Sequence, residues 1–197
     1  GAVPGAVDLL NTAAWTRGGL VVLPKHLTED RNLVEADGAP VPSQRLKSGE
    51  LVILAEDVPA LAARRYTLRK GDPAPAARPV AVDAGAATLD NGVVSLRLDP
   101  QTGGIAELHL AGLDANLADN ADGRTLNEYL YFIGDDPADA KGAEKVRIRV
   151  GEPGPLVASL VIESAAPGCR SLVTEIRLAA GEDTVEIVNT LDKERLV

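Results

Sequence analysis

The residues whose types and spacing best suit a chemical role lie close together in the second half of the chain. They are Arg124, Asn127, Tyr129 and Tyr131. Tyrosine rings can stack on the faces of sugars, and Asn and Arg side chains can hydrogen-bond to sugar hydroxyls. These four residues are therefore candidate carbohydrate contacts. The alternative is that the two tyrosines form part of a β-sandwich core. The chain has only one Trp, one Phe and three Tyr, which argues against a dedicated binding module with an aromatic platform.

The Asp-rich stretch 114–123 is the one segment that suggests calcium, and it fails the EF-hand pattern. Counting back from Gly123 places Ala118 where the first Asp of an EF-hand belongs. Tyr129 stands where the bidentate Glu is needed. A solvated turn is the expectation, and a calcium site of another kind stays open.

Zinc and catalytic patterns are also missing. His26 and His109 are the only histidines, and neither has a second ligand at zinc-site spacing. No Gly-x-Ser-x-Gly motif or phosphate-binding glycine loop occurs. We therefore predict no catalytic residue and no metal ligand in this chain.

Three further features receive structural interpretations. The adjacent acids Glu56-Asp57 and Asp135-Asp136 would face opposite ways in a strand and are interpreted as surface charge. Glycosidase carboxylates usually come from separate segments that converge in the fold, which adjacency cannot test. Cys169 follows Pro167-Gly168 in a predicted turn and is assigned a structural role.

Charge and composition limit the classes of partner. The 197 residues carry 20 Lys and Arg against 29 Asp and Glu, a net charge of −9. This balance argues against nucleic acid and anionic membranes as partners. One cysteine excludes an intrachain disulfide. We expect a soluble chain without a signal peptide or membrane span, and the compartment stays unknown.

The beginning of the sequence suggests a longer parent. The chain contains no methionine and starts at Gly1. We therefore expect it to be a segment of a larger protein.

The elements that must position these residues are predicted to be short strands. The first half contains alternating or apolar runs separated by turn residues, at 9–12, 20–23, 32–35, 51–54 and 64–68. Residues 1–70 are predicted to form a small β-sandwich domain. Residues 71–87 hold three prolines and several alanines and are predicted to be a linker.

The second domain, 88–197, is predicted to open with a hairpin over 89–108. Val94, Leu96 and Leu98 alternate with polar residues, and the stretch 99–104 has turn chemistry. A strand with two faces is predicted over 126–133, followed by four alternating strands. Short connections require antiparallel pairing, so the fold class is all-β.

Several motifs, taken in order, resemble glycoside hydrolase family 38, the α-mannosidases. The hairpin residues Leu89-Asp-Asn91, Leu96-Arg-Leu-Asp99 and Thr102-Gly-Gly-Ile105 resemble the hairpin that opens the large C-terminal β-domain of that family. Earlier and later motifs also correspond, namely Asn11 with Trp15-Thr16-Arg17, Asp37-Gly38 with Val41-Pro42-Ser43-Gln44, Val58-Pro59-Ala60-Leu61 with Tyr66, and 185–192. Ala62-Ala63 departs from the pattern, because Gly and an aromatic residue are more usual there.

The resemblance implies a small β-sandwich followed by part of a galactose-mutarotase-like β-supersandwich. It also implies a parent glycosidase that uses zinc or another divalent metal. In that family the metal ligands and the nucleophilic Asp lie in an α/β catalytic domain, and no matching motif is present here. We therefore expect an inactive fragment that holds no cofactor, braces the catalytic domain and contributes to the cleft for mannosides or other glycans.

Two alternatives remain open. In the first alternative, the chain is a stand-alone carbohydrate-binding module that uses the 124–131 face. In the second, it is a structural β-sandwich pair of a surface protein.

Overall fold

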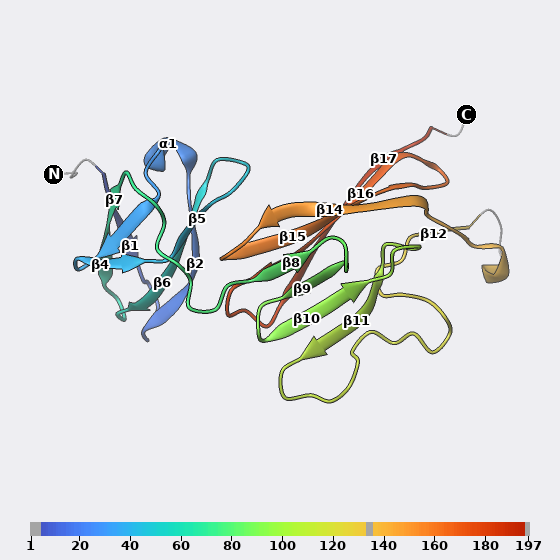
Figure 1. The fold of residues 1–197 in the computed structure, drawn as a ribbon, viewed down its shortest axis with the longest axis horizontal. Coiled ribbons are helices and arrows are strands. Elements are labelled where there is room, and N and C mark those ends of the chain that lie inside the picture. The colour runs from blue at the N-terminus through green and yellow to red at the C-terminus, as the bar shows by residue number, and fades with distance from the viewer. Residues whose placement is uncertain (1–4, 133–135, 196–197) are drawn as a thin grey trace. The chain divides into compact units, whose positions relative to one another are not determined.

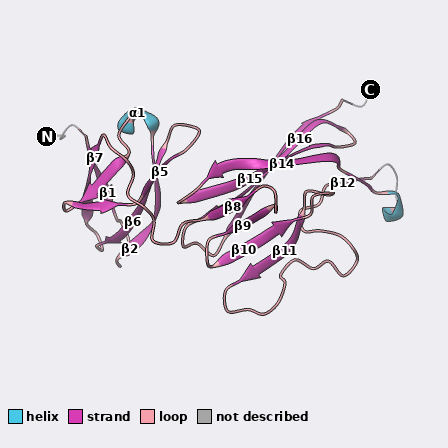
Figure 2. Cartoon of the chain, viewed as in Figure 1, coloured by secondary structure: helices cyan, strands magenta, loops and turns pink. Residues whose placement is uncertain are grey.

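The protein is described by a computed structural model that covers residues 5–132 and 136–195. Almost all of its regular structure is β-strand, which confirms the all-β prediction (Figure 2). The chain forms two compact units. Unit 1 comprises Gly1–Pro79 with Gly154–Leu156, and unit 2 comprises Val80–Pro153 with Val157–Val197. Neither helix in the described ranges has the length and apolar content needed to span a bilayer.

Unit 1 is built from short strands and a one-turn helix (Figure 1). Its elements are β1 (Ala6–Leu10), β2 (Arg17–Leu23), α1 (Lys25–Thr28), β3 (Leu33–Ala36), β4 (Ala39–Val41), β5 (Ser43–Arg45), β6 (Leu51–Val58) and β7 (Ala63–Arg69). One antiparallel sheet has the order β1-β7-β3-β4 and the other has the order β2-β6-β5.

The core of unit 1 lies between these two sheets. Alternation along β3 buries Val34 and Ala36, and the apolar start of β6 buries Leu51 and Ile53. Tyr66 of β7 joins the same cluster. This arrangement agrees with the predicted small β-sandwich.

Unit 2 contains the longer strands. Its elements are β8 (Ala81–Asp83), β9 (Thr88–Asp90), β10 (Val94–Leu98), β11 (Ile105–Leu110), β12 (Leu130–Tyr131), the 3-10 helix η1 (Pro137–Asp139), β13 (Lys141–Gly142), β14 (Glu144–Pro153), β15 (Val157–Ala165), β16 (Cys169–Ala179) and β17 (Val185–Lys193). The sheets have the orders β11-β10-β9-β8, β14-β15-β16-β17 and β12-β13. Contacts of β8 and β9 with β14, β15 and β16 show that the two four-stranded sheets pack together.

The predicted hairpin over 89–108 is confirmed. Strands β10 and β11 pair from Val94 opposite Leu110 to Leu98 opposite Ile105. In the turn, the Gly103 N–H donates to the Asp99 carbonyl at 2.8 Å, and Gly103 has a φ of +75°. The Asp99 side chain accepts the N–H groups of Gln101 and Thr102, so the turn residues have the role that their types predicted.

The predicted continuous strand over 126–133 is wrong. Leu126 forms only an isolated bridge with Ile105. Asn127 has a φ of +62°, which interrupts the extended chain, and Asn tolerates this conformation better than most residues. Only Leu130–Tyr131 is strand, and Ile133 lies outside the described residues.

The observed division between the units falls between Pro79 and Val80. Strand β8 lies within the range 71–87, which was predicted to be a linker, and pairs with β9 in unit 2. The amino-acid composition of this range did not indicate β8, because the strand is only three residues long and follows a proline-rich stretch. The boundaries 1–70, 71–87 and 88–197 remain predictions.

Candidate functional site

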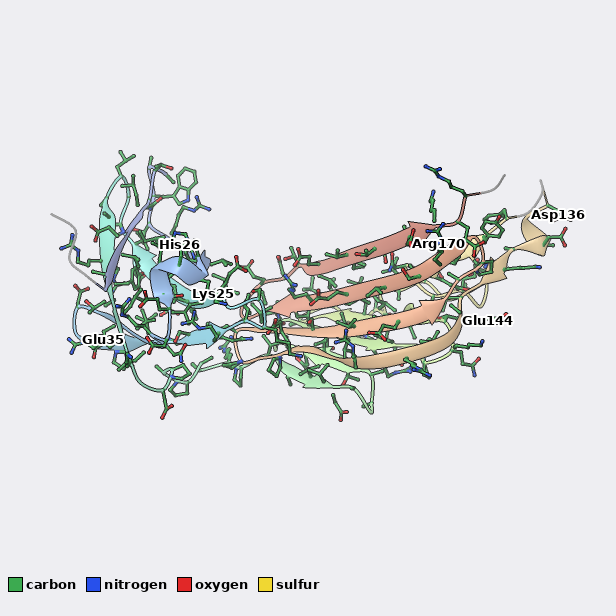
Figure 3. The ribbon with its side chains drawn as sticks, turned by 90° about the horizontal axis from the view of Figure 1, so that it is seen from above. Lys25, His26, Glu35, Asp136, Glu144 and Arg170 are labelled. Atoms are coloured by element: carbon green, nitrogen blue, oxygen red, sulfur yellow. The ribbon has the colours of Figure 1, made fainter. Side chains whose placement is uncertain are left out.

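A cavity of about 550 Å³ in unit 2 contains three of the four predicted site residues. Asn127, Tyr129 and Tyr131 line one wall, and residues of β16 and β17 line the other. The cavity includes Cys169, the first residue of β16. Figure 3 places the adjacent Arg170 at the same end of the four-stranded sheet as Glu144 of β14. Cavities of this volume are large enough for a small ligand.

Asn127 is held by a reciprocal amide pair. Its Nδ2 donates to Asn189 Oδ1 at 3.3 Å, and Asn189 Nδ2 donates to Asn127 Oδ1 at 2.9 Å. Thr174 Oγ1 also donates to Asn189 Oδ1 at 2.7 Å. Each amide keeps a second N–H that these bonds do not use.

Tyr129, in the wall of the cavity, is a hydrogen-bond donor to the turn that precedes β16. Its hydroxyl donates to the Pro167 carbonyl at 2.6 Å and lies 3.5 Å from Cys169 Sγ. The hydrogen bond with Cys169, together with burial, raises the pKa of Tyr129 to about 12. The phenol is therefore protonated at neutral pH and fixes the turn that precedes β16.

Tyr131 has its ring against Gly168. A Cβ at Gly168 would lie 2.5 Å from Tyr131 Cε2, and Gly168 has a φ of +75°. Glycine thus serves both the backbone conformation and the close approach of the ring. The Tyr131 hydroxyl has no hydrogen-bond partner within residues 5–132 and 136–195, so it is free to bind a ligand.

Arg124 does not line the cavity. Its Nη1 lies 4.0 Å from Glu128 Oε1. Glu128 does line the cavity, and its Oε2 accepts the Thr125 N–H at 3.0 Å. Asn127, Tyr129 and Tyr131 therefore line the same cavity. Arg124 lies outside the lining, next to Glu128.

Sequence reasoning missed two members of the site, Thr174 and Asn189. Thr174 is buried on β16, whereas Asn189 is exposed and shares a face of β17 with Val185 and Ile187. A polar residue that continues an otherwise apolar alternation was the available signal. Cys169 had been assigned a structural role, and its contact with Tyr129 fits that role.

The other candidates occupy separate places. In the 114–123 stretch, Asn116 Oδ1 accepts the Leu108 N–H and the Ala118 N–H, while Asn120 Nδ2 donates to the Ala106 carbonyl. These side chains act as turn caps. His26 lies beside Lys25 on α1, as Figure 3 shows, whereas His109 is on β11. Asp135 lies outside the described residues.

No metal site can be assigned to the described part of the chain. Within it, no three His, Cys, Asp or Glu side chains are grouped closely enough to hold an ion. The polar groups of the cavity are the amides of Asn127 and Asn189, the hydroxyls of Tyr129, Tyr131 and Thr174, and the charged side chains of Glu128, Lys193 and Glu194.

Comparison with solved structures relates 94% of this chain to parts of larger proteins. A protein in glycosyl hydrolase family 38 from Enterococcus faecalis matches with a TM-score of 0.56 and 12% identity, over 94% of this chain and 31% of its own. An alpha-mannosidase from Enterococcus faecalis V583 matches with a TM-score of 0.55 and 12% identity, over 94% and 29%. The chain therefore has a fold found within family 38 glycoside hydrolases.

The resemblance inferred from the motifs thus agrees with the fold. The chain spans about three tenths of the length of the solved structures that it matches. No family model matches the sequence. No curated protein sequence matches it either.

Proposed function

We propose that this chain is a non-catalytic β-region of an α-mannosidase-like glycoside hydrolase, in which it braces a catalytic α/β domain. The observation that carries the proposal is the match over 94% of this chain, through both units, to part of two family 38 structures. The ordered motifs from Asn11 to Asp192 support the same assignment.

The proposal assigns the chemistry to the rest of the parent protein. The described residues offer no metal cluster, and we assign no hydrolytic step to them. The divalent metal, zinc by the resemblance, and the nucleophilic carboxylate would be supplied by the catalytic domain.

The test is expression of the protein from its complete natural reading frame. We expect that protein to hydrolyse an aryl α-mannoside and to lose activity with a chelator, while the 197-residue chain alone shows no hydrolysis. A complete reading frame without an additional metal-binding domain, or hydrolysis by the 197-residue chain itself, would contradict the proposal.

A second candidate function is glycan binding in the cavity. It is supported by the free Tyr131 hydroxyl and by the unused N–H groups of Asn127 and Asn189. Tyr131→Phe keeps the ring against Gly168 and removes only the hydroxyl. Binding of mannosides that weakens several-fold in Tyr131→Phe would favour this function, with Leu113→Ala on an exposed loop as the control. No binding at millimolar sugar would count against it.

A further inference from the structure

Three exposed apolar residues of unit 1 lie on segments that are joined by hydrogen bonds, outside the cavity of unit 2 and outside the core of unit 1. They are Leu10, Trp15 and Leu61, which are 66%, 67% and 72% exposed. We call these three residues the apolar tip. Trp15 is the only tryptophan of the chain. Contiguous exposed apolar groups on a soluble domain usually mark a contact surface.

The tip is held in place by Asn11. This residue is buried, and its Nδ2 contacts the Trp15 carbonyl at 2.8 Å and the Val58 and Pro59 carbonyls at 3.0 Å. Its backbone N–H donates to the Ala62 carbonyl at 2.9 Å. The loops that carry Trp15 and Leu61 are thereby tied to each other.

Leu61 is exposed on a backbone conformation that is unfavourable for leucine. It has a φ of +50°, a region that leucine rarely adopts. Its N–H donates to the Ala13 carbonyl at 3.0 Å, which fixes this geometry. A side chain so exposed adds almost nothing to the core of unit 1, so the folding of unit 1 does not account for a leucine here.

The surroundings of the tip indicate its partner. Beside it lies a hollow of about 200 Å³, lined by residues that include Leu10, Arg17, Leu20 and Val21. Arg17 is exposed and has no ion-pair partner within the described ranges. Leu10 and Leu61, the other two members of the tip, offer no hydrogen-bonding side chain, which favours a protein surface over a sugar.

The size of the surface favours a domain of the same polypeptide. Three such side chains expose only a few hundred Å², whereas a stable complex of separate proteins buries about 800 Å² on each partner. Interfaces between domains of one chain are often smaller, because covalent linkage supplies a high effective concentration.

We propose that the apolar tip docks into an apolar socket on another domain of the same polypeptide, with Arg17 facing a carboxylate at the rim. This inference rests on the proposed function, in which the chain is one region of a larger enzyme. It adds the surface through which unit 1 braces its partner and the chemistry that the partner must present.

The test compares variants of the protein expressed from its complete reading frame. We expect Trp15→Ala and Leu61→Ala each to raise the rate of limited proteolysis between this region and the remainder about tenfold or more, because a tryptophan at an interface centre often dominates binding. Leu27→Ala is the matched control, since Leu27 is an exposed leucine of unit 1 on α1. Unchanged proteolysis in both tip variants would overturn the proposal.

Measurements on the 197-residue chain alone distinguish an effect of Trp15 on docking from an effect on folding. We expect Trp15→Ala to leave its thermal unfolding unchanged, since the side chain is exposed. A large loss of stability there would make Trp15 a structural residue and overturn the proposal. Quenching of the Trp15 fluorescence by mannose oligosaccharides would also overturn it, in favour of a glycan platform.

Mannosidase activity of the unsubstituted complete protein is measured in parallel. Its absence would refute the proposed function, while tip-dependent proteolysis would still report domain docking. The two failures are therefore distinguishable.

Discussion

Asn127 and Asn189 exchange two side-chain hydrogen bonds, at 2.9 and 3.3 Å, and so tie the 124–131 segment to the edge strand β17. Asn189 also accepts a hydrogen bond from Thr174. The polar wall of the cavity is thus a connected network, and its geometry depends on one amide.

Asn189→Ala should loosen this wall. We expect a loss of about 1 kcal/mol in the free energy of unfolding, since the bonds are partly solvent-exposed, and faster hydrogen exchange across 124–131. Urea denaturation and hydrogen-exchange mass spectrometry measure the two effects. Thr190→Ala, on the opposite face of β17, is the control. Equal exchange in the two variants would show that the amide pair does not hold the segment.

Gly168→Ala should be more costly than an alanine at another glycine of the same conformation. The new Cβ would meet the Tyr131 ring at 2.5 Å. Gly181 has a φ of +76° against +75° at Gly168, and a Cβ there would meet nothing within 4 Å. Gly181→Ala therefore reports the backbone strain alone.

We expect Gly168→Ala to destabilise unit 2 by about 1–3 kcal/mol more than Gly181→Ala. Adding Tyr131→Ala should recover the steric part, and chemical denaturation of the four variants gives the coupling energy. Additive effects of the Gly168 and Tyr131 substitutions would refute the close contact.

Much of the fold could be predicted from the sequence where apolar alternation was clear. The alternation of Val94, Leu96 and Leu98 predicted β10, and the turn residues Asp99 and Gly103 predicted its reversal, because these signals are local. Strand β5 was missed for the opposite reason. Ser43 and Gln44 are polar but buried, and Ser43 Oγ donates to the Asn32 carbonyl, a long-range compensation that a hydrophobicity pattern cannot reveal.

The candidate site was predicted in part. Tyr129 and Tyr131 were identified by residue type, but Asn189 was not, because it is distant in sequence from the segment it contacts. Alternation also suggested a continuous strand through Asn127, where a positive φ interrupts it. Local sequence patterns identified the 124–131 segment. Its contact with β17 is set by the tertiary fold, which local patterns do not reveal.

Asn91 should be among the most sensitive polar residues of unit 2. It is buried, its Nδ2 donates to the Ala179 and Glu182 carbonyls, and its Oδ1 accepts the Val93 and Val94 N–H groups. Asn91→Ala therefore removes one hydrogen-bond partner from each of four backbone groups that are partly or fully buried.

We expect Asn91→Ala to lower the free energy of unfolding by about 2–4 kcal/mol, measured by urea denaturation. Asp90→Ala is the control, because within the described residues its side chain accepts only the Gly92 N–H, at an exposed position. A loss below 1 kcal/mol would contradict the assigned network.

Tyr66→Phe should leave unit 1 as stable as before or make it more stable. Tyr66 is almost fully buried, and its hydroxyl has no hydrogen-bond partner within the described residues. Removing a buried polar group that lacks a partner removes a desolvation cost. Thermal unfolding at neutral pH tests this, and a clear destabilisation would indicate a hydrogen bond that the structure does not contain.

Tyr129 should make the stability of unit 2 dependent on alkaline pH. Its pKa is raised to about 12 in the folded protein, through its hydrogen bond with Cys169 and through burial, whereas an unperturbed tyrosine has a pKa of about 10. The folded state therefore holds this proton more tightly than the unfolded state. The resulting stabilisation is fully present below pH 10 and is lost as the pH rises from 10 to 12.

Tyr129→Phe is the matched variant, because it keeps the ring and removes the titrating group. We expect the unfolding free energy of the unsubstituted protein to fall more steeply than that of Tyr129→Phe between about pH 10 and about pH 12, a window set by these two pKa values. Absorbance at about 295 nm, which reports tyrosinate, should show one late-titrating group fewer in the variant. Parallel stability curves would mean that Tyr129 ionises as it does in the unfolded chain, and that its hydroxyl does not fix the turn before β16.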